Sequence, residues 1–473
     1  MQSVSTVPVP RNEPAHDYAP GTPQRASLHA ELAEMASVAV DLTMTIGGVQ
    51  RLGGGEPLQV VQPHARHEVL GTMRGATHQD ASEAIEAALA AAPAWAAMAY
   101  EDRAAILLKA ADLLAGPRRD RLNAATMLGQ SKTPYQAEID AACELIDFLR
   151  FNVAFGRRLL EEAGLPPGVL NLVTGDGIAV SEVALAHREL AGIHFTGSTR
   201  VFQQLWRGVA DNLHSYKSYP RLVGETGGKD FVLAHPSADP AVLRTALVRG
   251  AFEYQGQKCS AASRAYLPRS LWQQMGDDLI AETESLSMGD VRDFSHFMGA
   301  VIDERAFARL TEVQKRAVND PALEVVAGGS SDDREGWFVR PTIITTTDPM
   351  HDVMTTEFFG PLLSVLVYDD ADYDTVLRQA ADAAPYALTG SVISQDRAAI
   401  AVASELLRNA AGNFYVNDKP TGAVVGQQPF GGARASGTND KAGSYLNLVR
   451  WVSPRVIKET FDPPRDYRYP HMR

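Results

Sequence analysis

The feature that most constrains the fold is a repeated strand, turn and helix pattern that begins at Gly168. Residues 169–173 and 192–195 are short apolar runs, and each is followed by a Gly-containing turn. The second turn leads into a helical pattern over residues 200–209. Alternation of short strands with helices favours a parallel sheet that is covered by helices on both faces. We therefore predict an α/β protein with doubly wound sheets.

The second half of the chain repeats this alternation and predicts a second α/β unit. Helical periodicity is found at 240–249, 271–284, 304–318, 373–383 and 397–407. The predicted strands are 230–233, 263–267, 339–346, 362–367, 388–393 and 413–416. A chain of 473 residues is long enough for two or three such domains.

The N-terminal region has a different pattern. Five prolines before residue 26 predict an extended arm, and short strands are predicted at 44–46 and 58–61. Helices are predicted at 79–92, where Pro93 would end the helix, at 102–114, and from Tyr135 toward Phe155. Cys143 falls inside the last helix, so we interpret it as a packed core thiol.

Charge and composition exclude several classes of protein. The chain has 57 acidic and 44 basic residues, a net charge of -13, and no Lys/Arg-rich run that could follow a nucleic-acid backbone. No apolar run is long enough to span a bilayer, and the first 23 residues lack the regions of a signal peptide. Its two cysteines have no metal-ligand spacing, so no metal is predicted. We expect a soluble, cytoplasmic protein.

The second cysteine, Cys259, is a candidate nucleophile. It follows a Gly-containing turn and lies between Lys258 and Ser260, a short way after a Gly-Glu-Thr-Gly-Gly-Lys loop that contains Glu225. A lone cysteine of this kind can be catalytic, although many free cysteines are only small buried hydrophobes. The surrounding Gly-rich loops favour the catalytic interpretation.

A possible phosphate site is the turn at Thr196, Gly197 and Ser198, which opens the helix at 200–209. Unpaired N–H groups at a helix start suit a pyrophosphate, but the same turn can be a plain helix cap. The dinucleotide fingerprint Gly-x-Gly-x-x-Gly is absent, so this turn alone does not identify a nicotinamide cofactor.

Four motifs together carry a resemblance to a known family. They are the Gly-Glu-Thr-Gly-Gly-Lys loop at 224–229, Gly-Gln-Lys-Cys at 256–259, Glu-Phe-Phe-Gly-Pro at 357–361 and Pro-Phe-Gly-Gly at 429–432. In this order, with 34 positions between Glu225 and Cys259, they resemble the aldehyde dehydrogenase superfamily. The flanking residues are similar to the branch that oxidises L-glutamate γ-semialdehyde (1-pyrroline-5-carboxylate) to glutamate with NAD in proline catabolism.

The resemblance implies an NAD-dependent oxidoreductase with a Rossmann-like cofactor domain and a catalytic cysteine. Cys259 would attack the aldehyde to give a thiohemiacetal and then a thioester, and Glu225 would activate the hydrolytic water. Lys258 would also help to form the Cys259 thiolate. The substrate, an aldehyde with an α-amino acid head, would be bound by Lys258, Ser260, Gly422, Ala423 and Phe430. NAD would contact Thr196, Gly197, Ser198, Glu357 and Phe359.

The sequence departs from the family after Phe155. Family members carry several dozen residues there, including an Asn of the oxyanion hole and a Lys that binds the adenosine ribose. Here Phe155 continues directly into Gly156 and on to Leu165. The resemblance therefore implies an incomplete cofactor-domain sheet, with weakened or lost NAD binding and impaired activity. The alternative is a non-redox, cysteine-dependent acyl-transfer or condensing enzyme, or an inactive pseudoenzyme.

The predicted organisation has four parts. Residues 1–26 form the arm, 27–225 the NAD-binding domain truncated after 155, 226–436 the catalytic domain, and 437–473 a return and oligomerisation segment. Residues 446–461 are predicted to form a long strand. Because an exposed strand of this length tends to pair with another chain, we expect a homodimer or a higher homo-oligomer.

Overall fold

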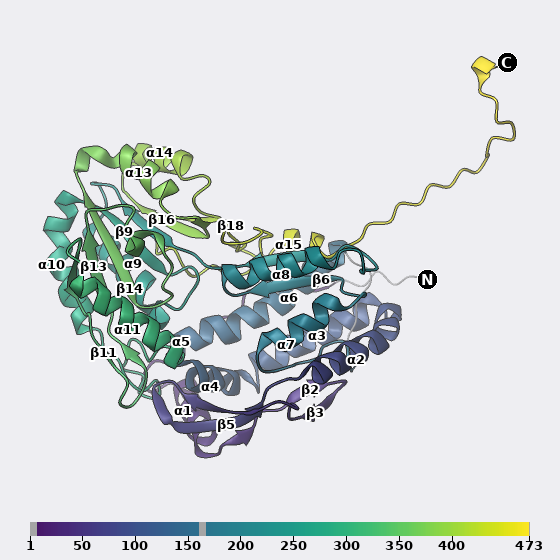
Figure 1. Ribbon diagram of the computed structural model, residues 1–473, viewed down its shortest axis with the longest axis horizontal. Helices are drawn as coiled ribbons and strands as arrows, with labels where there is room; N and C mark the ends of the chain where they lie inside the picture. The colour runs from purple at the N-terminus through teal and green to yellow at the C-terminus, as the bar shows by residue number, and fades with distance from the viewer. Residues whose placement is uncertain (1–6, 160–166, 473) are drawn as a thin grey trace.

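The structure is a computed structural model that describes residues 7–159 and 167–472. One end of the molecule is a sheet covered by helices and built from the second half of the chain (Figure 1). The other end combines the N-terminal helices and strands with the two-stranded unit that follows them. The first six residues of the predicted arm lie outside the described residues.

A seven-stranded sheet organises the second half of the chain. Its order is β10-β13-β14-β9-β8-β16-β17, and every neighbouring pair is parallel except β10 with β13. The strands are β8 (Asp230–Ala234), β9 (Ala262–Pro268), β10 (Leu323–Ala327), β13 (Thr342–Thr346), β14 (Leu362–Tyr368), β16 (Thr389–Ile393) and β17 (Asn413–Val416). This sheet confirms the predicted α/β fold class.

Helices cover both faces of this sheet, so it is doubly wound. Successive residues of β8 enter different cores: Val232 packs in the core that contains Leu247, whereas Phe231 packs with Leu377 on the other face. All of these side chains are buried. The helices are α9 (Pro240–Phe252), α10 (Arg269–Ser285), α11 (Glu304–Asn319), α12 (Asp352–Thr355), α13 (Tyr373–Asp382) and α14 (Arg397–Leu406).

The N-terminal half forms a layer of helices beside small sheets. The helices are α1 (Pro23–Ser37), α2 (His78–Ala97), α3 (Tyr100–Ala115), α4 (Arg119–Gln130), α5 (Pro134–Ala137), a π-helical turn (Glu138–Cys143) and α6 (Glu144–Leu159). The strands are β1 (Val40–Asp41), β2 (Met44–Ile46), β3 (Val49–Arg51), β4 (Pro57–Gln62) and β5 (Ala65–Arg74). Cys143 is buried in the π-helical turn, as predicted.

Two boundaries in this half differ from the prediction. Helix α1 begins at Pro23, inside the predicted arm, because Thr22 caps the helix and proline is tolerated at its first position. Helix α2 continues through Pro93 to Ala97. Leu89, four residues earlier, is 42% exposed, so water can bond the carbonyl that Pro93 leaves without a donor.

Residues 27–225 are predicted to contain a cofactor-binding sheet. The parallel sheet in this part of the chain has only two described strands, β6 (Gly192–Thr196) and β7 (Arg221–Glu225), which we call the cofactor-side strands. Helices α7 (Gly177–Ala186) and α8 (Thr199–Asp211) accompany them. No residue of α7 is buried, and Ile178 is 61% exposed. Parallel sheets are normally covered on both faces. The described residues therefore form the incomplete cofactor-domain sheet that the sequence predicts.

Two predicted strands differ in the structure. The prediction at 169–173 is wrong: only Leu172 forms a bridge, with Thr45, and Leu170 is exposed. A strand needs a neighbouring strand, and in the described part of the chain residues 169–173 have no strand partner beyond that single bridge. The predicted strand at 339–346 is two strands, β12 (Phe338–Val339), which pairs with β11 (Ser331–Asp332), and β13. They separate at Pro341, which has no N–H to donate.

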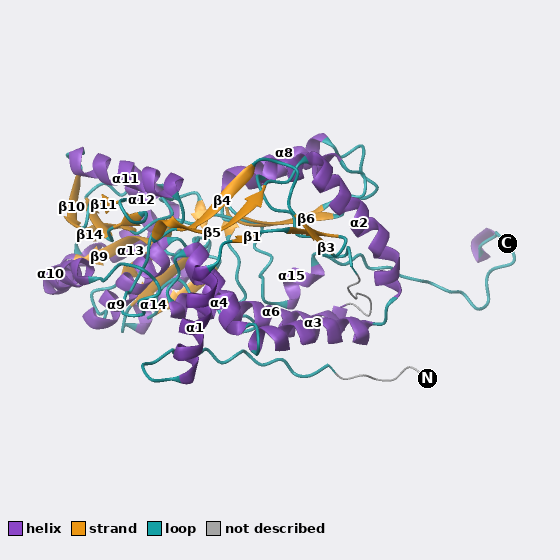
Figure 2. Cartoon of the chain, turned by 90° about the horizontal axis from the view of Figure 1, so that it is seen from below, coloured by secondary structure: helices purple, strands orange, loops and turns teal. Residues whose placement is uncertain are grey.

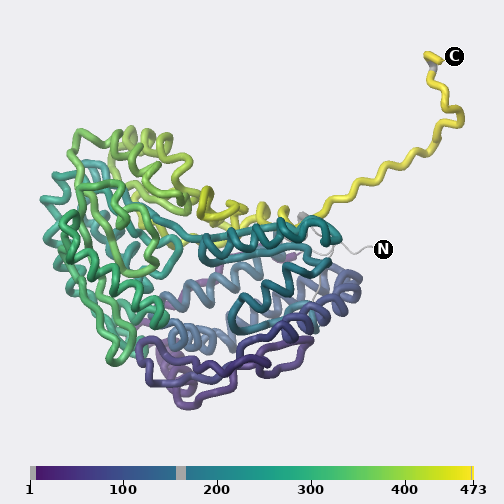
Figure 3. Tube along the Cα trace, in the orientation of Figure 1, coloured from purple at the N-terminus to yellow at the C-terminus, as the bar shows by residue number. Residues whose placement is uncertain are grey.

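The C-terminal return runs back to the cofactor side, where Gly437 forms a bridge with Glu225. The predicted strand at 446–461 is wrong for this chain, since the segment begins as helix α15 (Tyr445–Val449) and continues as an extended tail. Figures 2 and 3 show the tail leaving the body. Val456 and Phe461 are 92% and 90% exposed. A strand requires a neighbouring strand that supplies backbone hydrogen bonds, and no described strand lies beside this segment.

Candidate active site

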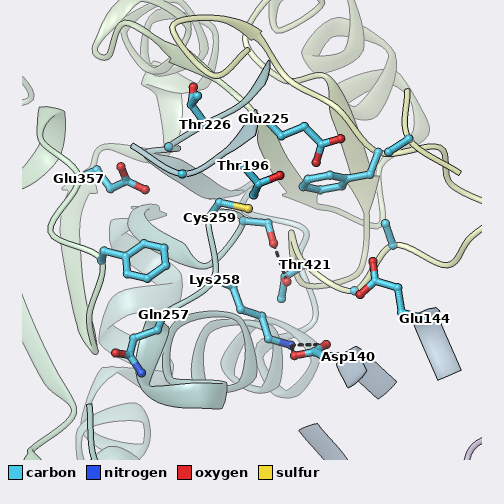
Figure 4. A pocket seen from close by; sticks show the side chains of 18 of the residues that line it. Asp140, Glu144, Thr196, Glu225, Thr226, Gln257, Lys258, Cys259, Glu357 and Thr421 are labelled. Carbon is cyan, nitrogen blue, oxygen red and sulfur yellow. Dashed lines mark hydrogen bonds and ion pairs between the residues drawn. The ribbon is translucent and has the colours of Figure 1, made fainter. Parts of the chain in front are cut away.

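All twelve predicted site residues line one cavity of about 820 Å³. The cavity lies where the catalytic sheet, the cofactor-side strands, the C-terminal return and helix α6 meet (Figure 4). The twelve residues come from distant parts of the chain: Thr196, Gly197, Ser198, Glu225, Lys258, Cys259, Ser260, Glu357, Phe359, Gly422, Ala423 and Phe430. Their meeting is the main structural support for the sequence prediction.

A strained turn carries the candidate nucleophile into this cavity. Tyr254, Gln255 and Gly256 have positive φ angles of 49°, 55° and 64° in a short 3-10 helix, Glu253–Gly256. Gln255 holds the turn, because its amide nitrogen donates to the carbonyl of Ala300 at 2.6 Å. A Cβ on Gly256 would lie 2.3 Å from a backbone oxygen. Left-handed, closely packed backbone of this kind occurs where a functional side chain must be aimed.

The environment of Cys259 keeps its sulfur protonated at rest. Burial raises the pKa of the Cys259 thiol, and the carboxylates of Asp230, Glu225 and Glu357 raise it further. Figure 4 shows the sulfur directed into the space that Glu225 also faces. A nearby base must therefore take the thiol proton before Cys259 can attack.

Lys258 does not supply the positive charge that the sequence suggested for the thiolate. Its Nζ donates to Gln136 Oε1 at 2.6 Å and forms an ion pair with Asp140 at 3.1 Å. Lys132 binds the same carboxylate at 2.9 Å. Figure 4 shows Lys258 extending away from Cys259 toward Asp140. The charge of Lys258 therefore neutralises Asp140 in the cavity wall rather than the sulfur of Cys259.

Glu225 stands at the end of β7 with the properties of a general base. Burial raises the pKa of its carboxyl to about 7, with a further contribution from Asp440 and an opposing one from Lys441. A carboxyl that titrates near neutral pH can both accept and release a proton under physiological conditions. Its backbone is fixed by the bridge to Gly437.

The predicted carboxylate site lies on one side of the cavity. Ser260 Oγ is 2.8 Å from Thr421 Oγ1, at the start of the segment that contains Gly422 and Ala423. We call residues 422–428 the anchor loop. Gly422 has a φ of +99°, a conformation that favours glycine. The segment ends where Phe430 forms a bridge with Ala442.

The residues present fit part of NAD. Ser198 caps helix α8 by accepting from Val201 N at 3.3 Å, so the start of a 13-residue helix faces the cavity beside Gly197. Glu357 is held by the backbone N–H of Gly228 at 3.0 Å. These groups suit the pyrophosphate and the nicotinamide ribose. The described lining residues include no asparagine, so the oxyanion Asn of the family has no counterpart among them. The two lysines of the lining, Lys132 and Lys258, both pair with Asp140, so neither replaces the Lys that binds the adenosine ribose.

Sequence reasoning missed one acidic wall. Asp140, Glu144 and Phe148 line the cavity from the helical segment that ends in α6. Glu144 is an exposed residue, and partial desolvation of its carboxyl in the cavity, together with Asp140, raises its pKa to about 7. The signal was present in the four-residue spacing of these side chains, which places them on one face of a helix.

Comparison with known proteins places the chain in a family. The sequence model of the aldehyde dehydrogenase family matches residues 51–162 and 157–451. The delta-1-pyrroline-5-carboxylate dehydrogenase of Dictyostelium discoideum is 41% identical over 540 positions, covering 99% of this chain and 96% of the relative. The human mitochondrial enzyme of the same name is 40% identical over 530 positions, with 98% and 94% coverage. The chain belongs to the aldehyde dehydrogenase family.

Solved structures agree with this membership. The aldehyde dehydrogenase fold of this chain matches the delta-pyrroline-5-carboxylate dehydrogenase of Mycobacterium tuberculosis, bound with NAD, with a TM-score of 0.95. The two are 52% identical, and the match covers 100% of each chain. The Thermus thermophilus enzyme is 28% identical with a TM-score of 0.87.

The comparisons also locate the missing block. The alignment with the Dictyostelium relative spans 540 positions, more than the 473 residues of this chain, so the relative has residues without a counterpart here. The family model matches in two separate segments, and the first ends and the second begins within residues 157–162, shortly after Phe155. Residues 160–166 lie outside the described part of the chain. The two-stranded β6-β7 sheet is the structural counterpart of this shortened sequence.

Proposed function

We propose that this aldehyde dehydrogenase oxidises L-glutamate γ-semialdehyde, which is in equilibrium with 1-pyrroline-5-carboxylate, to L-glutamate with NAD. The observation that carries this proposal is the single cavity in which Cys259, Glu225 and the anchor loop meet. Family membership and the names of the relatives support the same reaction.

The first step uses Cys259 and a nearby base. Glu225, whose pKa is about 7, can accept the thiol proton as the sulfur bonds to the aldehyde carbon. The aldehyde oxygen becomes the oxyanion of a thiohemiacetal. NAD, held by Gly197, Ser198 and Glu357, would accept the hydride that leaves this carbon as the thioester forms. The described lining residues provide no Asn for the oxyanion, so this step is expected to be slow.

The second step is hydrolysis of the thioester. Glu225 first releases the thiol proton to solvent, which its pKa of about 7 allows, and then takes a proton from water as the water oxygen bonds to the acyl carbon. The carbon–sulfur bond then breaks, glutamate leaves, and the Cys259 thiolate regains a proton. One carboxyl can serve both steps because its pKa lies near neutral pH.

The two ends of the substrate head have matching partners. Ser260 and the N–H groups of Gly422 and Ala423 suit the α-carboxylate. Glu144, on the α6 wall, suits the α-ammonium, since a nearby cation would hold this carboxyl in its charged form. Phe430 can cover the aliphatic part. This arrangement favours an amino-acid aldehyde over a simple one.

Substrate discrimination tests this assignment. The kcat/KM for glutamate semialdehyde should exceed that for pentanal by about 10³-fold or more, because the polar anchor is left unpaired by an aldehyde without a head. Ser260→Ala should lower kcat/KM for glutamate semialdehyde about tenfold and leave that for pentanal unchanged. Equal use of the two aldehydes by the unmodified chain would contradict the proposed substrate.

Replacement of Glu225 tests its role as base. Glu225→Gln should lower kcat by about 10²-fold, the usual contribution of a general base. The unmodified enzyme should gain activity as pH rises through about 7, because its raised pKa leaves Glu225 protonated below that value. This limb of the pH profile should be absent in Glu225→Gln. The exposed Glu312→Gln is a matched control that should keep both activity and pH profile.

A non-redox acyl-transfer enzyme or an inactive relative is the alternative, and the two-stranded cofactor-side sheet is what favours it. Retention of both Cys259 and Glu225 in one cavity argues against an inactive protein. NADH formation separates the alternatives.

Location and assembly remain predictions. No helix in the described part of the chain is long and apolar enough to cross a membrane. We propose a cytoplasmic location, although the animal relatives are named mitochondrial enzymes. The exposed C-terminal tail supports the proposal of a homodimer or higher homo-oligomer.

A further inference from the structure

Asn12, in the N-terminal arm, contacts the anchor loop from a distant part of the sequence. Its Nδ2 donates to the carbonyl of Val425 at 2.9 Å, and its Oδ1 accepts from Gln427 Nε2 at 2.9 Å. Among the described residues, the side-chain hydrogen bonds that reach the anchor loop from outside all involve Asn12. This residue therefore has a connection to the substrate side of the cavity that its sequence position does not suggest.

The arm is itself fixed to the helical layer, so Asn12 can act as a rigid support. Its Nδ2 also donates to Asp147 Oδ2 at 2.7 Å, and the backbone N–H of Glu13 donates to Asp147 Oδ1 at 2.7 Å. Farther along, the backbone N–H of His16 donates to Glu138 at 2.7 Å. Asp147 and Glu138 are buried. Buried, multiply bonded carboxylates make firm attachment points.

The anchor loop has few other external supports. Within the loop, Val424 N donates to Gln428 Oε1 at 3.0 Å, which shapes the loop but does not attach it. The backbone of Gly426 bonds Gly443 at 3.1 Å, and the space beside its Cα is filled by Phe151 of α6. Asn12 thus supplies the side-chain hydrogen bonds of an attachment that also includes the Gly426–Gly443 backbone bond and the apolar contact with Phe151.

We propose that Asn12 is a positioning residue for the α-carboxylate site: it holds the anchor loop so that the N–H groups of Gly422 and Ala423 face the substrate. The inference rests on the proposed function, since it concerns the same carboxylate site. Asn12 does not line the cavity and therefore acts through the loop. Loss of its bonds should weaken binding of the amino-acid head without affecting the cofactor side.

The test compares three variants of the full chain. Asn12→Ala removes both bonds to the loop, and Gln427→Ala removes one of them from an exposed loop residue without touching the arm. Arg11→Ala, at the neighbouring exposed position, is the control. Two readouts are needed: hydrogen–deuterium exchange of residues 422–428, and the Kd values of glutamate and NAD from calorimetry.

Asn12→Ala should accelerate exchange in the anchor loop and raise the glutamate Kd about tenfold, with the NAD Kd unchanged. Gln427→Ala should give a smaller change of the same kind, and Arg11→Ala none. Unchanged loop exchange in Asn12→Ala, or equal weakening of glutamate and NAD, would overturn the inference. If the unmodified chain does not bind glutamate, the proposed function fails, and the exchange comparison still decides whether Asn12 holds the loop.

Discussion

Cys259→Ala should abolish NADH formation, with a loss of at least about 10⁴-fold in kcat. The sulfur forms the covalent bond on which both the oxidation and the hydrolysis depend, and alanine cannot replace it. The other lining residues would still bind ligands, so the glutamate Kd should change by less than about threefold. Steady-state NADH formation and calorimetry on the same preparation measure the two quantities.

Cys143→Ala is the matched control for this experiment. Burial raises the pKa of the Cys143 thiol, and the side chain lies in the π-helical turn rather than along the cavity. This variant should keep its activity at temperatures where it is folded. Residual NADH formation by Cys259→Ala above about a hundredth of the unmodified rate would mean that another group carries the chemistry.

Restoring the missing block should raise kcat by about 10² to 10³-fold, the usual effect of one oxyanion-hole donor. The segment between Phe155 and Leu165 would be replaced by the corresponding segment of the Mycobacterium tuberculosis enzyme, which is 52% identical to this chain. The graft should also lower the NAD Kd by about tenfold or more. It should raise the free energy of unfolding, because α7 residues such as Ile178 would gain a cover.

The control for the graft is a Gly/Ser linker of the same length at the same junction. The linker restores chain length but neither the asparagine nor the lysine, so its kcat and NAD Kd should equal those of the unmodified chain. A graft that binds NAD no better than this linker would show that the missing block is not what limits the cofactor site.

The sequence predicted best those elements whose partners lie within this chain. Residues 230–233 and 413–416 are strands in the seven-stranded sheet, where each has a neighbouring strand from this same chain. The run at 169–173 has an equally strand-like sequence but forms only one bridge, at Leu172. The tail after Val449 pairs with no strand in the described part of the chain. Local pattern indicates a tendency to extend, whereas a strand needs a neighbour that supplies hydrogen bonds.

The order of the motifs predicted which residues form the site, but not their ion pairs or their pKa values. All twelve predicted residues line the cavity. The sequence could not reveal that Asp140 would pair with Lys258, or that burial would raise the pKa of Glu225 to about 7, because both depend on contacts between distant segments. The four-residue spacing of Asp140, Glu144 and Phe148 places them on one helix face, but that this face lines the cavity depends on how α6 packs.

The dehydrogenase assignment is tested most directly by NADH formation from the unmodified chain with glutamate semialdehyde at saturating NAD. We expect slow turnover in which NADH and glutamate appear in equal amounts. No NADH at any NAD concentration, from a protein in which Cys259 is still alkylated, would contradict the dehydrogenase assignment and favour a non-redox thiol enzyme.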